Sequence, residues 1–246
     1  MTGLSVKRVV VGAIGAIGGY LFLVRLGGLA KFEPDWLPYA AELVGALIVG
    51  GALARVGTRH RFEALAAGVL SVVIVGTVAF ASPTTYGWVA ARSAHPWPTA
   101  VALAIGCGAT AQLGAWFAYG RGGLLSIVVL STGVSFAMVL FGGRLVAAFG
   151  AGIVTVDESV AIVLVLVLAL LAGFTVQSVV PLANAGACAS GAAIFVALSV
   201  IETEVHGQDN SGLLWMVLTV AAAFGGALVA QALRPKSREL ETSAFD

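Results

Sequence analysis

Charge is what this sequence lacks most. Only 10% of its 246 residues are Asp, Glu, Lys or Arg, and 59% are hydrophobic. The mean hydropathy is +1.02. A water-soluble domain of this size has to cover its surface with charge, so the composition excludes one. The charges fall in short clusters, separated by uncharged runs long enough to cross a bilayer. We predict an all-α, polytopic integral protein of the cell membrane, in contact with the lipid bilayer.

Alternation of polar and apolar residues is also missing, which excludes membrane strands. Residues 160–176 read VAIVLVLVLALLAGFTV, whereas transmembrane strands alternate lipid-facing with lumen-facing residues. A helix satisfies its own backbone hydrogen bonds in hydrocarbon and needs no such alternation. The apolar runs are therefore predicted to be helices.

Cysteine and histidine are scarce, with two and three residues respectively. Cys107 and Cys188 both lie in apolar segments, which is typical of buried small hydrophobic residues rather than of a disulfide or a metal site. His60, His95 and His206 are not spaced three or four residues apart, and none lies mid-membrane. This spacing argues against a haem or metal site, and we predict no cofactor.

Enzyme and nucleic-acid signatures are absent as well. The chain has no His-Glu-x-x-His, Gly-x-Ser-x-Gly or Walker lysine motif. Its one adjacent acidic pair, Asp157-Glu158, directly precedes an apolar run, where helix capping and the helix dipole explain it. The net charge is +1, and no basic stretch is interleaved with aromatic residues. We expect no nucleic-acid partner, and the sequence favours a protein that is not an enzyme.

What the chain has in abundance is apolar runs of spanning length, each near the roughly 20 residues that cross the hydrocarbon core. We predict eight transmembrane helices at about Val9–Ala30, Leu37–Ala54, Phe62–Ala81, Pro98–Tyr119, Leu124–Phe149, Ser159–Val180, Ala185–Ile201 and Leu213–Leu233. Residues 1–233 then form one transmembrane domain, and residues 234–246 form a short polar tail.

The basic residues predict the orientation, because Lys and Arg favour cytoplasmic loops. With the N-terminus inside, nine basic residues are cytoplasmic, namely Lys7, Arg8, Arg55, Arg59, Arg61, Arg121, Arg234, Lys236 and Arg238. Four lie opposite, namely Arg25, Lys31, Arg92 and Arg144. Eight spans then place both termini, and the polar tail, on the cytoplasmic side.

An even number of spans permits a parallel duplication of four helices plus four. Gly27-Gly28 and Gly142-Gly143 lie near the ends of the first and fifth runs, each with an arginine close by. In a chain with 32 glycines, we interpret this correspondence as coincidence.

Small residues four apart on the same helix face predict close helix packing, because a neighbouring backbone can approach there. Such pairs are Gly15/Gly19, Ala41/Gly45, Ala46/Gly50, Ala64/Gly68, Ala104/Gly108, Thr110/Gly114, Ala187/Gly191 and Ala222/Gly226. The run at Ala185–Ile201 is small on nearly all sides and is predicted to lie inside the bundle. The run at Ser159–Val180 is rich in Val and Leu and is predicted to face lipid.

Polar residues inside the predicted spans are few, and such residues often mark function. Arg25 and Glu42 lie in the outer quarters of consecutive spans, so we predict a structural ion pair between them. Gln112 lies closest to a membrane centre and is a candidate to face a cavity or another helix. The sequence places no carboxylate mid-helix, which argues against an ion-coupled pump.

The loop at Ser82–Pro98 is the most distinctive stretch, with aromatic residues beside Arg92 and His95. One interpretation is a short helix on the outer surface, anchored by Trp88 and Trp97. The other is a lid over an outer vestibule, in which Arg92 and Arg144 attract an anionic group.

The candidate substrate-binding residues are therefore Arg92, His95, Trp88, Gln112 and Arg144. Two functions fit these features: a small transporter or permease-like protein, or a non-catalytic membrane subunit that joins other subunits or its own copies, or binds lipid. A third, weaker interpretation is an intramembrane enzyme acting on a lipid. A polar cavity reaching the midplane would favour transport, and a dry, filled bundle would favour the subunit.

Overall fold

The computed structural model is an all-helical bundle. It describes residues 5–32, 34–56, 62–81, 90, 93–118, 123–143, 158–180, 183–205 and 213–234. Within these ranges, eight helices are long and apolar enough to cross a membrane, as the sequence predicted.

The helices begin and end close to the predicted runs. They are α1 (Val6–Leu29), α2 (Leu37–Arg55), α3 (Glu63–Ala81), α4 (Pro96–Phe117), α5 (Leu124–Phe136), α7 (Glu158–Val179), α8 (Ala185–Val205) and α9 (Leu213–Ala232). α5 continues as a π-helix, η2 (Ala137–Gly142). The fifth predicted span reached Phe149, but residues 144–150 lie outside the described residues.

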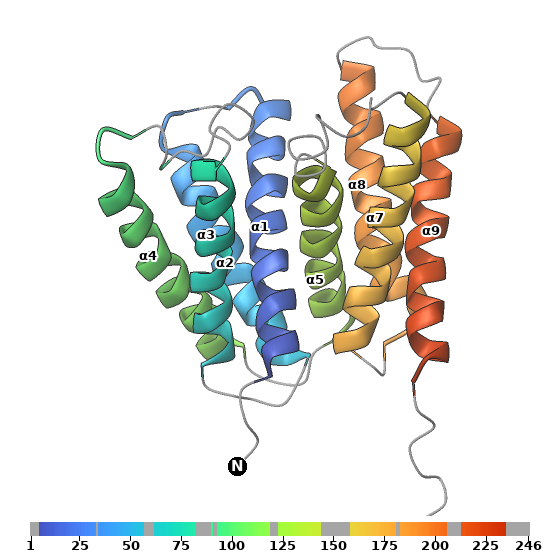
Figure 1. The fold of residues 1–246 in the computed structure, drawn as a ribbon, viewed down its shortest axis with the longest axis horizontal. Coiled ribbons are helices and arrows are strands. Elements are labelled where there is room, and N and C mark those ends of the chain that lie inside the picture. Colours follow the sequence, from blue (N-terminus) through green and yellow to red (C-terminus); the bar gives the residue numbers. More distant parts are fainter. Residues whose placement is uncertain are drawn as a thin grey trace, which may run out of the picture.

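The helices run back and forth between two edges of the bundle. α1 begins at the lower edge in Figure 1, and α9 ends at that edge. The lower edge therefore carries the starts of α1, α3, α5 and α8 and the ends of α2, α4, α7 and α9. α1–α4 form an N-terminal half, and α5, η2 and α7–α9 form a C-terminal half, with α1 and α5 adjacent between them (Figure 1).

The two halves repeat the same helix packing. In the N-terminal half α2 packs against α4 and α1 against α3, and in the C-terminal half α7 packs against α9 and α5 against α8. α1 and α5 pack against each other where the halves meet. Because both halves begin at the same edge, the repeat is parallel, and its axis runs along the helices.

The crossings of α2 with α4 and of α7 with α9 match in detail. Gly50 of α2 lies so close to α4 that a Cβ would overlap the carbonyl oxygen of Ala111. Gly173 of α7 has the same relation to the carbonyl of Ala223 in α9. Glycine at both positions lets the two backbones touch.

The same crossings also match from the opposite helix. A Cβ at Gly114 of α4 would overlap the carbonyl oxygen of Leu47, and one at Gly226 of α9 would overlap that of Leu170. The spacing is conserved between halves, because Leu47 precedes Gly50 by the same three residues that separate Leu170 from Gly173. The duplication is thus a property of the packing.

The glycine pairs singled out in the sequence do not mark this repeat. Gly27 lies against Leu37 and Gly142 against Leu168, and these leucines do not occupy matching positions of α2 and α7. Neither glycine pair takes part in the α2/α4 and α7/α9 crossings in which the two halves repeat the same packing.

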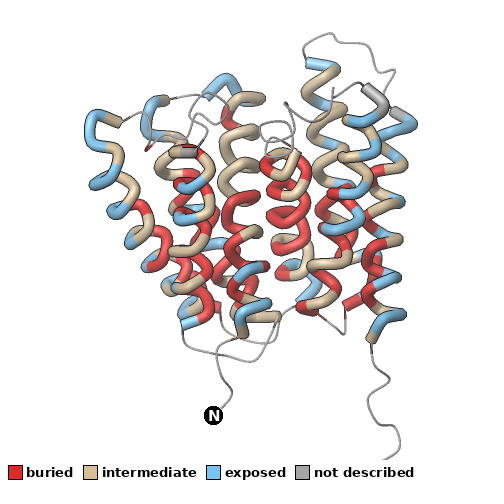
Figure 2. Tube along the Cα trace, in the orientation of Figure 1, coloured by how far each residue is buried: buried red, intermediate tan, exposed pale blue. Residues whose placement is uncertain are grey.

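The most buried helix is not the one that the sequence predicted to lie inside the bundle. α5 with η2 is the most buried, with 61% of its apolar stretch inside the bundle against 39% for α8 (Figure 2). α7 exposes Val163 and Val167 as predicted, but one face of its second part, with Ala169, Ala172 and Val176, is buried. α5 is buried because it packs against α1, α2, α7 and α8.

Candidate functional site

Three of the predicted site residues, Trp88, Arg92 and Arg144, lie outside the described residues. His95 precedes the first turn of α4, where its carbonyl accepts hydrogen bonds from Thr99, and its side chain is exposed. Gln112 lies five residues before the end of α4, half-buried. His95 and Gln112 are therefore at opposite ends of one helix and do not form a common site.

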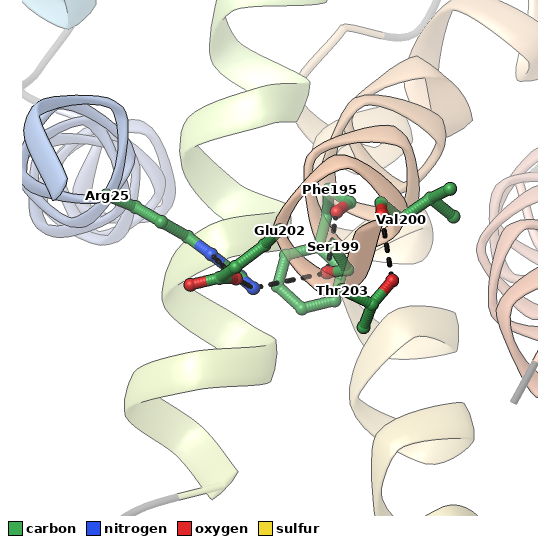
Figure 3. Close-up of polar contacts among 6 residues, drawn as sticks. All are labelled: Arg25, Phe195, Ser199, Val200, Glu202 and Thr203. Atoms are coloured by element: carbon green, nitrogen blue, oxygen red, sulfur yellow. Dashed lines mark hydrogen bonds and ion pairs between the residues drawn. The ribbon is translucent and has the colours of Figure 1, made fainter. Parts of the chain in front are cut away.

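The structure pairs Arg25 with Glu202 of α8, not with Glu42. The Arg25 Nε–Glu202 Oε2 distance is 2.7 Å, and Nη2 contacts the same oxygen (Figure 3). Nη2 also donates to Ser199 at 3.4 Å, and the guanidinium lies 5.5 Å from the centre of the Phe195 ring. The predicted Arg25–Glu42 pair is therefore wrong.

Helix orientation explains this error. Arg25 lies on the face of α1 that looks across the boundary between the halves, where the end of α8 reaches the same edge. Glu42 lies deeper and faces the inside of the N-terminal half. Consecutive spans share a loop, but sequence alone does not show which way each side chain points.

Glu42 is one of two buried carboxylates among the described residues of the N-terminal half, with 7% of its surface exposed; the other is Glu63. It lies three residues before Gly45, on the same face of α2. Gly45 meets the backbone of Gly19 and Tyr20 in α1 so closely that a side chain would overlap it. This close crossing brings Glu42 against α1.

The surroundings of Glu42 place it midway between the upper and lower edges of the N-terminal half. With Ser71 and Val72 of α3, Cys107 of α4 and Tyr20 of α1, it lines a small cavity. These neighbours lie near the centres of α1, α3 and α4. The sequence interpretation that no carboxylate lies mid-helix holds for Glu42, which is the sixth residue of α2, but Glu42 borders the central turns of three neighbouring helices.

The cavity beside Glu42 is small and partly polar. It leaves about 10 Å³ for the centre of a water molecule, roughly the space that one water requires. The Ser71 hydroxyl donates to the Gly68 carbonyl at 2.8 Å. Four residues with ionisable or hydroxyl side chains, Tyr20, Glu42, Ser71 and Cys107, thus line one water-sized space.

The matching place in the C-terminal half has different chemistry. The crossings match Leu47 with Leu170, so Glu42 and Val165, each five residues earlier, occupy corresponding positions. They also match Ala111 with Ala223, so Cys107 and Thr219, each four residues earlier, correspond as well. Val165 and Thr219 both line a groove of about 330 Å³ between α7, α8 and α9. At this matching position the N-terminal half has a carboxylate and the C-terminal half has a valine.

At the lower edge, an ion pair that sequence reasoning missed holds the N-terminal half together. Arg8 Nε lies 3.1 Å from Glu63 Oε2, and both side chains are nearly buried. Arg8 also donates to the Leu53 carbonyl at 2.8 Å, and the Ser5 amide donates to Glu63 at 3.1 Å. Glu63 opens α3, so the favourable charge at a helix start was the available signal.

The C-terminal half is held at the same edge by side-chain hydrogen bonds to backbone carbonyls. Gln177 is fully buried, and its amide nitrogen donates to the Ala183 carbonyl at 3.0 Å. Arg234 donates to the Gln177 carbonyl at 3.2 Å, and Gln231 to that of Ala183 at 3.2 Å. These bonds tie the ends of α7 and α9 to the turn before α8.

Ser131 is a second polar contact that the sequence did not single out. Its hydroxyl donates to the Cys188 carbonyl at 2.6 Å and accepts from the Gly191 amide at 2.9 Å. This bridge holds α5 against α8 in the packed interior. A serine in an apolar run carries no signal that would have distinguished it.

The described residues contain no group of three or more His, Cys, Asp or Glu side chains arranged to hold a metal ion. Comparison with known proteins gives no match: no family profile, no characterised protein sequence and no solved structure matches this chain. The features on which a function can be based are thus the eight apolar helices, their duplicated packing and the Glu42 cavity.

Proposed function

We propose that this chain is a small membrane transporter in which Glu42 binds the coupling proton or cation. It lies in the cell membrane with both termini in the cytoplasm, as the distribution of basic residues favours. The observation that carries the proposal is the buried Glu42 carboxylate at the middle level of the N-terminal half, beside Tyr20, Ser71 and Cys107.

Carboxylates inside membrane spans support this function because they are costly to keep there. Residues of this kind face bundle interiors and mark ion pathways and proton relays in pumps and transporters. Glu63 is held by Arg8 at the bundle edge, which explains Glu63 as a structural group. The positions that border Glu42 supply hydroxyl and thiol groups but no Lys or Arg among the described residues.

The parallel repeat supports the same function. Transporters are commonly built from two repeats whose relative motion exposes a central site to each side of the membrane in turn. Here α1 and α5 meet at the boundary between the halves, and α5 changes there into the π-helix η2. Short π segments inside α-helices are frequent at functional sites.

The alternative, a non-catalytic membrane subunit, is favoured by the tight α1/α5 boundary. A Cβ at Gly18 would overlap the Gly133 backbone, and one at Gly133 would overlap that of Gly15. A scaffold would keep this boundary closed, whereas a transporter opens it or the space beside it.

The two cysteines separate these functions without knowledge of the substrate. Cys107 borders the Glu42 cavity, whereas Cys188 lies in the packed α5/α8 contact. Both are 1% exposed. The Cys188→Ser variant, which keeps Cys107, and the Cys107→Ser variant, which keeps Cys188, are reconstituted in sealed vesicles. A small, charged, membrane-impermeant thiol reagent is added outside or enclosed inside.

A transporter predicts that Cys107 is modified from either side, because alternating access brings water to its cavity. Cys188 then reacts from neither side or at least about tenfold more slowly. Modification of neither cysteine would favour the static subunit and would contradict the proposed function. Equal modification of both would show general loosening of the bundle and would also contradict it.

A further inference from the structure

A groove opens between α3 and α4 on the outside of the N-terminal half. The two helices touch where Gly68 lies against the Cys107 carbonyl and Gly108 lies against Val69. Beyond this contact α4 leans away from α3 toward the upper edge (Figure 1). The space between them has a volume of about 420 Å³.

The groove opens toward the surface that meets lipid. Val73 and Val101 line it and are about half exposed, and Trp97 at its upper end is 68% exposed. Trp97 stacks on Phe80, with ring centres 4.4 Å apart. The Thr77 hydroxyl is already bonded to the Val73 carbonyl at 2.7 Å. The groove therefore offers apolar and aromatic walls to a molecule that arrives through the bilayer.

The groove and the Glu42 cavity share a wall. Val72 lines both spaces, with the groove on one side of α3 and the carboxylate on the other. The route that we infer below requires Val72 or α3 to move so that the two spaces join. The apolar groove would then end at a carboxylate.

We infer that the molecule this site takes is an amphiphilic organic cation, which enters from the lipid between α3 and α4 and places its charge at Glu42. This inference rests on the proposed function. Apolar walls suit the body of such a molecule, and aromatic faces and a carboxylate both attract a cation. Among the described residues that line the two spaces, none is Lys or Arg, so nothing there would favour an anion.

Two probes of equal shape and opposite charge test the inference. Tetraphenylphosphonium is a lipophilic cation, and tetraphenylborate is the matching anion. Binding of each to the purified full chain in detergent is measured by titration calorimetry. The unmodified chain should bind the cation, and the anion should neither bind nor compete.

Four variants locate the site. Glu42→Gln removes the charge and should weaken cation binding by about tenfold or more, which corresponds to about 1.4 kcal/mol. Glu204→Gln, at an exposed carboxylate near the end of α8, should leave it unchanged. Val73→Trp fills the groove from an exposed position and should also weaken binding. Val163→Trp, on the exposed face of α7, is its matched control and should not.

Equal binding of the two probes would overturn the inference, as would unchanged cation binding in both Glu42→Gln and Val73→Trp. A loss of cation binding in Val163→Trp as large as that in Val73→Trp would also overturn the inference. If Cys107 is modified from both sides but the cation does not bind, the proposed transporter function is supported and the inferred substrate class is wrong. If Cys107 is modified from neither side, the proposed function itself fails.

Discussion

The two halves of this protein share a scaffold but not a chemistry. Glycines at matching positions bring α2 onto α4 and α7 onto α9, at Gly50 and at Gly173. Within this common frame, the N-terminal half has Glu42 beside a cavity of about 10 Å³. The C-terminal half has Val165 at the matching position, beside an apolar groove of about 330 Å³.

This difference separates residues that set the fold from residues that set the function. Helices in lipid gain little from the hydrophobic effect, so close backbone contact at small residues determines which helices pair. Two halves that pack alike need these contacts in each half. A binding group need be present only once, and the copy without it is free to become apolar.

The largest stability effect should come from the Arg8–Glu63 ion pair of the N-terminal half. Arg8→Gln leaves the Glu63 carboxylate nearly buried without its charged partner. We expect a loss of about 3–5 kcal/mol in the free energy of unfolding. The measurement is denaturation in mixed detergent micelles.

The double variant Arg8→Gln/Glu63→Gln should recover part of this loss, because it removes the buried charge. Arg234→Gln in the other half should cost only about 1 kcal/mol, since it removes a hydrogen bond to the Gln177 carbonyl. Equal losses in Arg8→Gln and Arg234→Gln would mean that the two halves are stabilised in the same way at this edge.

The glycine crossings should respond alike in both halves. A methyl group at Gly114 or Gly226 would overlap a backbone carbonyl, so Gly114→Ala and Gly226→Ala should each cost about 1–3 kcal/mol. Gly225 has nothing within 4 Å of an added Cβ. Gly225→Ala should therefore be neutral or stabilising, although it adjoins Gly226. The same denaturation assay checks this, and a loss in one half only would argue against the repeat.

The smallest stability effect should come from the link between the halves. Arg25 and Glu202 are partly exposed, and exposed ion pairs contribute about 0–1 kcal/mol. Glu202→Gln should thus unfold nearly as the unmodified chain does. If the halves move against each other, the same variant should speed modification of Cys107 from the upper side. An unchanged rate would mean that this pair does not hold the halves together.

The spans were predictable because apolar runs of membrane length have one physical explanation. α2, for example, begins at the predicted Leu37 and ends within one residue of the predicted Ala54. The small-residue pairs were also predictive, since Gly50, Gly114 and Gly226 all lie at close crossings.

Helix orientation and pairing were not predictable. An apolar helix in lipid has no polar face to define its inside, so the sequence did not show that Arg25 looks toward α8. It did not show that Glu42 looks toward the middle of α1, α3 and α4. The duplication was hidden for a related reason: only the few residues at the crossings must be kept, and the glycine pairs near Arg25 and Arg144 were not among them.

The most direct test of the account is whether Glu42 exchanges a proton inside the membrane. Dicyclohexylcarbodiimide is lipid-soluble and reacts with protonated carboxyl groups, and its adducts are located by peptide mass spectrometry. In the unmodified chain, we expect labelling at Glu42 that decreases as pH rises. Glu63, held by Arg8, should stay unlabelled. No labelling of Glu42 at any pH, or equal labelling of Glu63, would contradict the role assigned to Glu42.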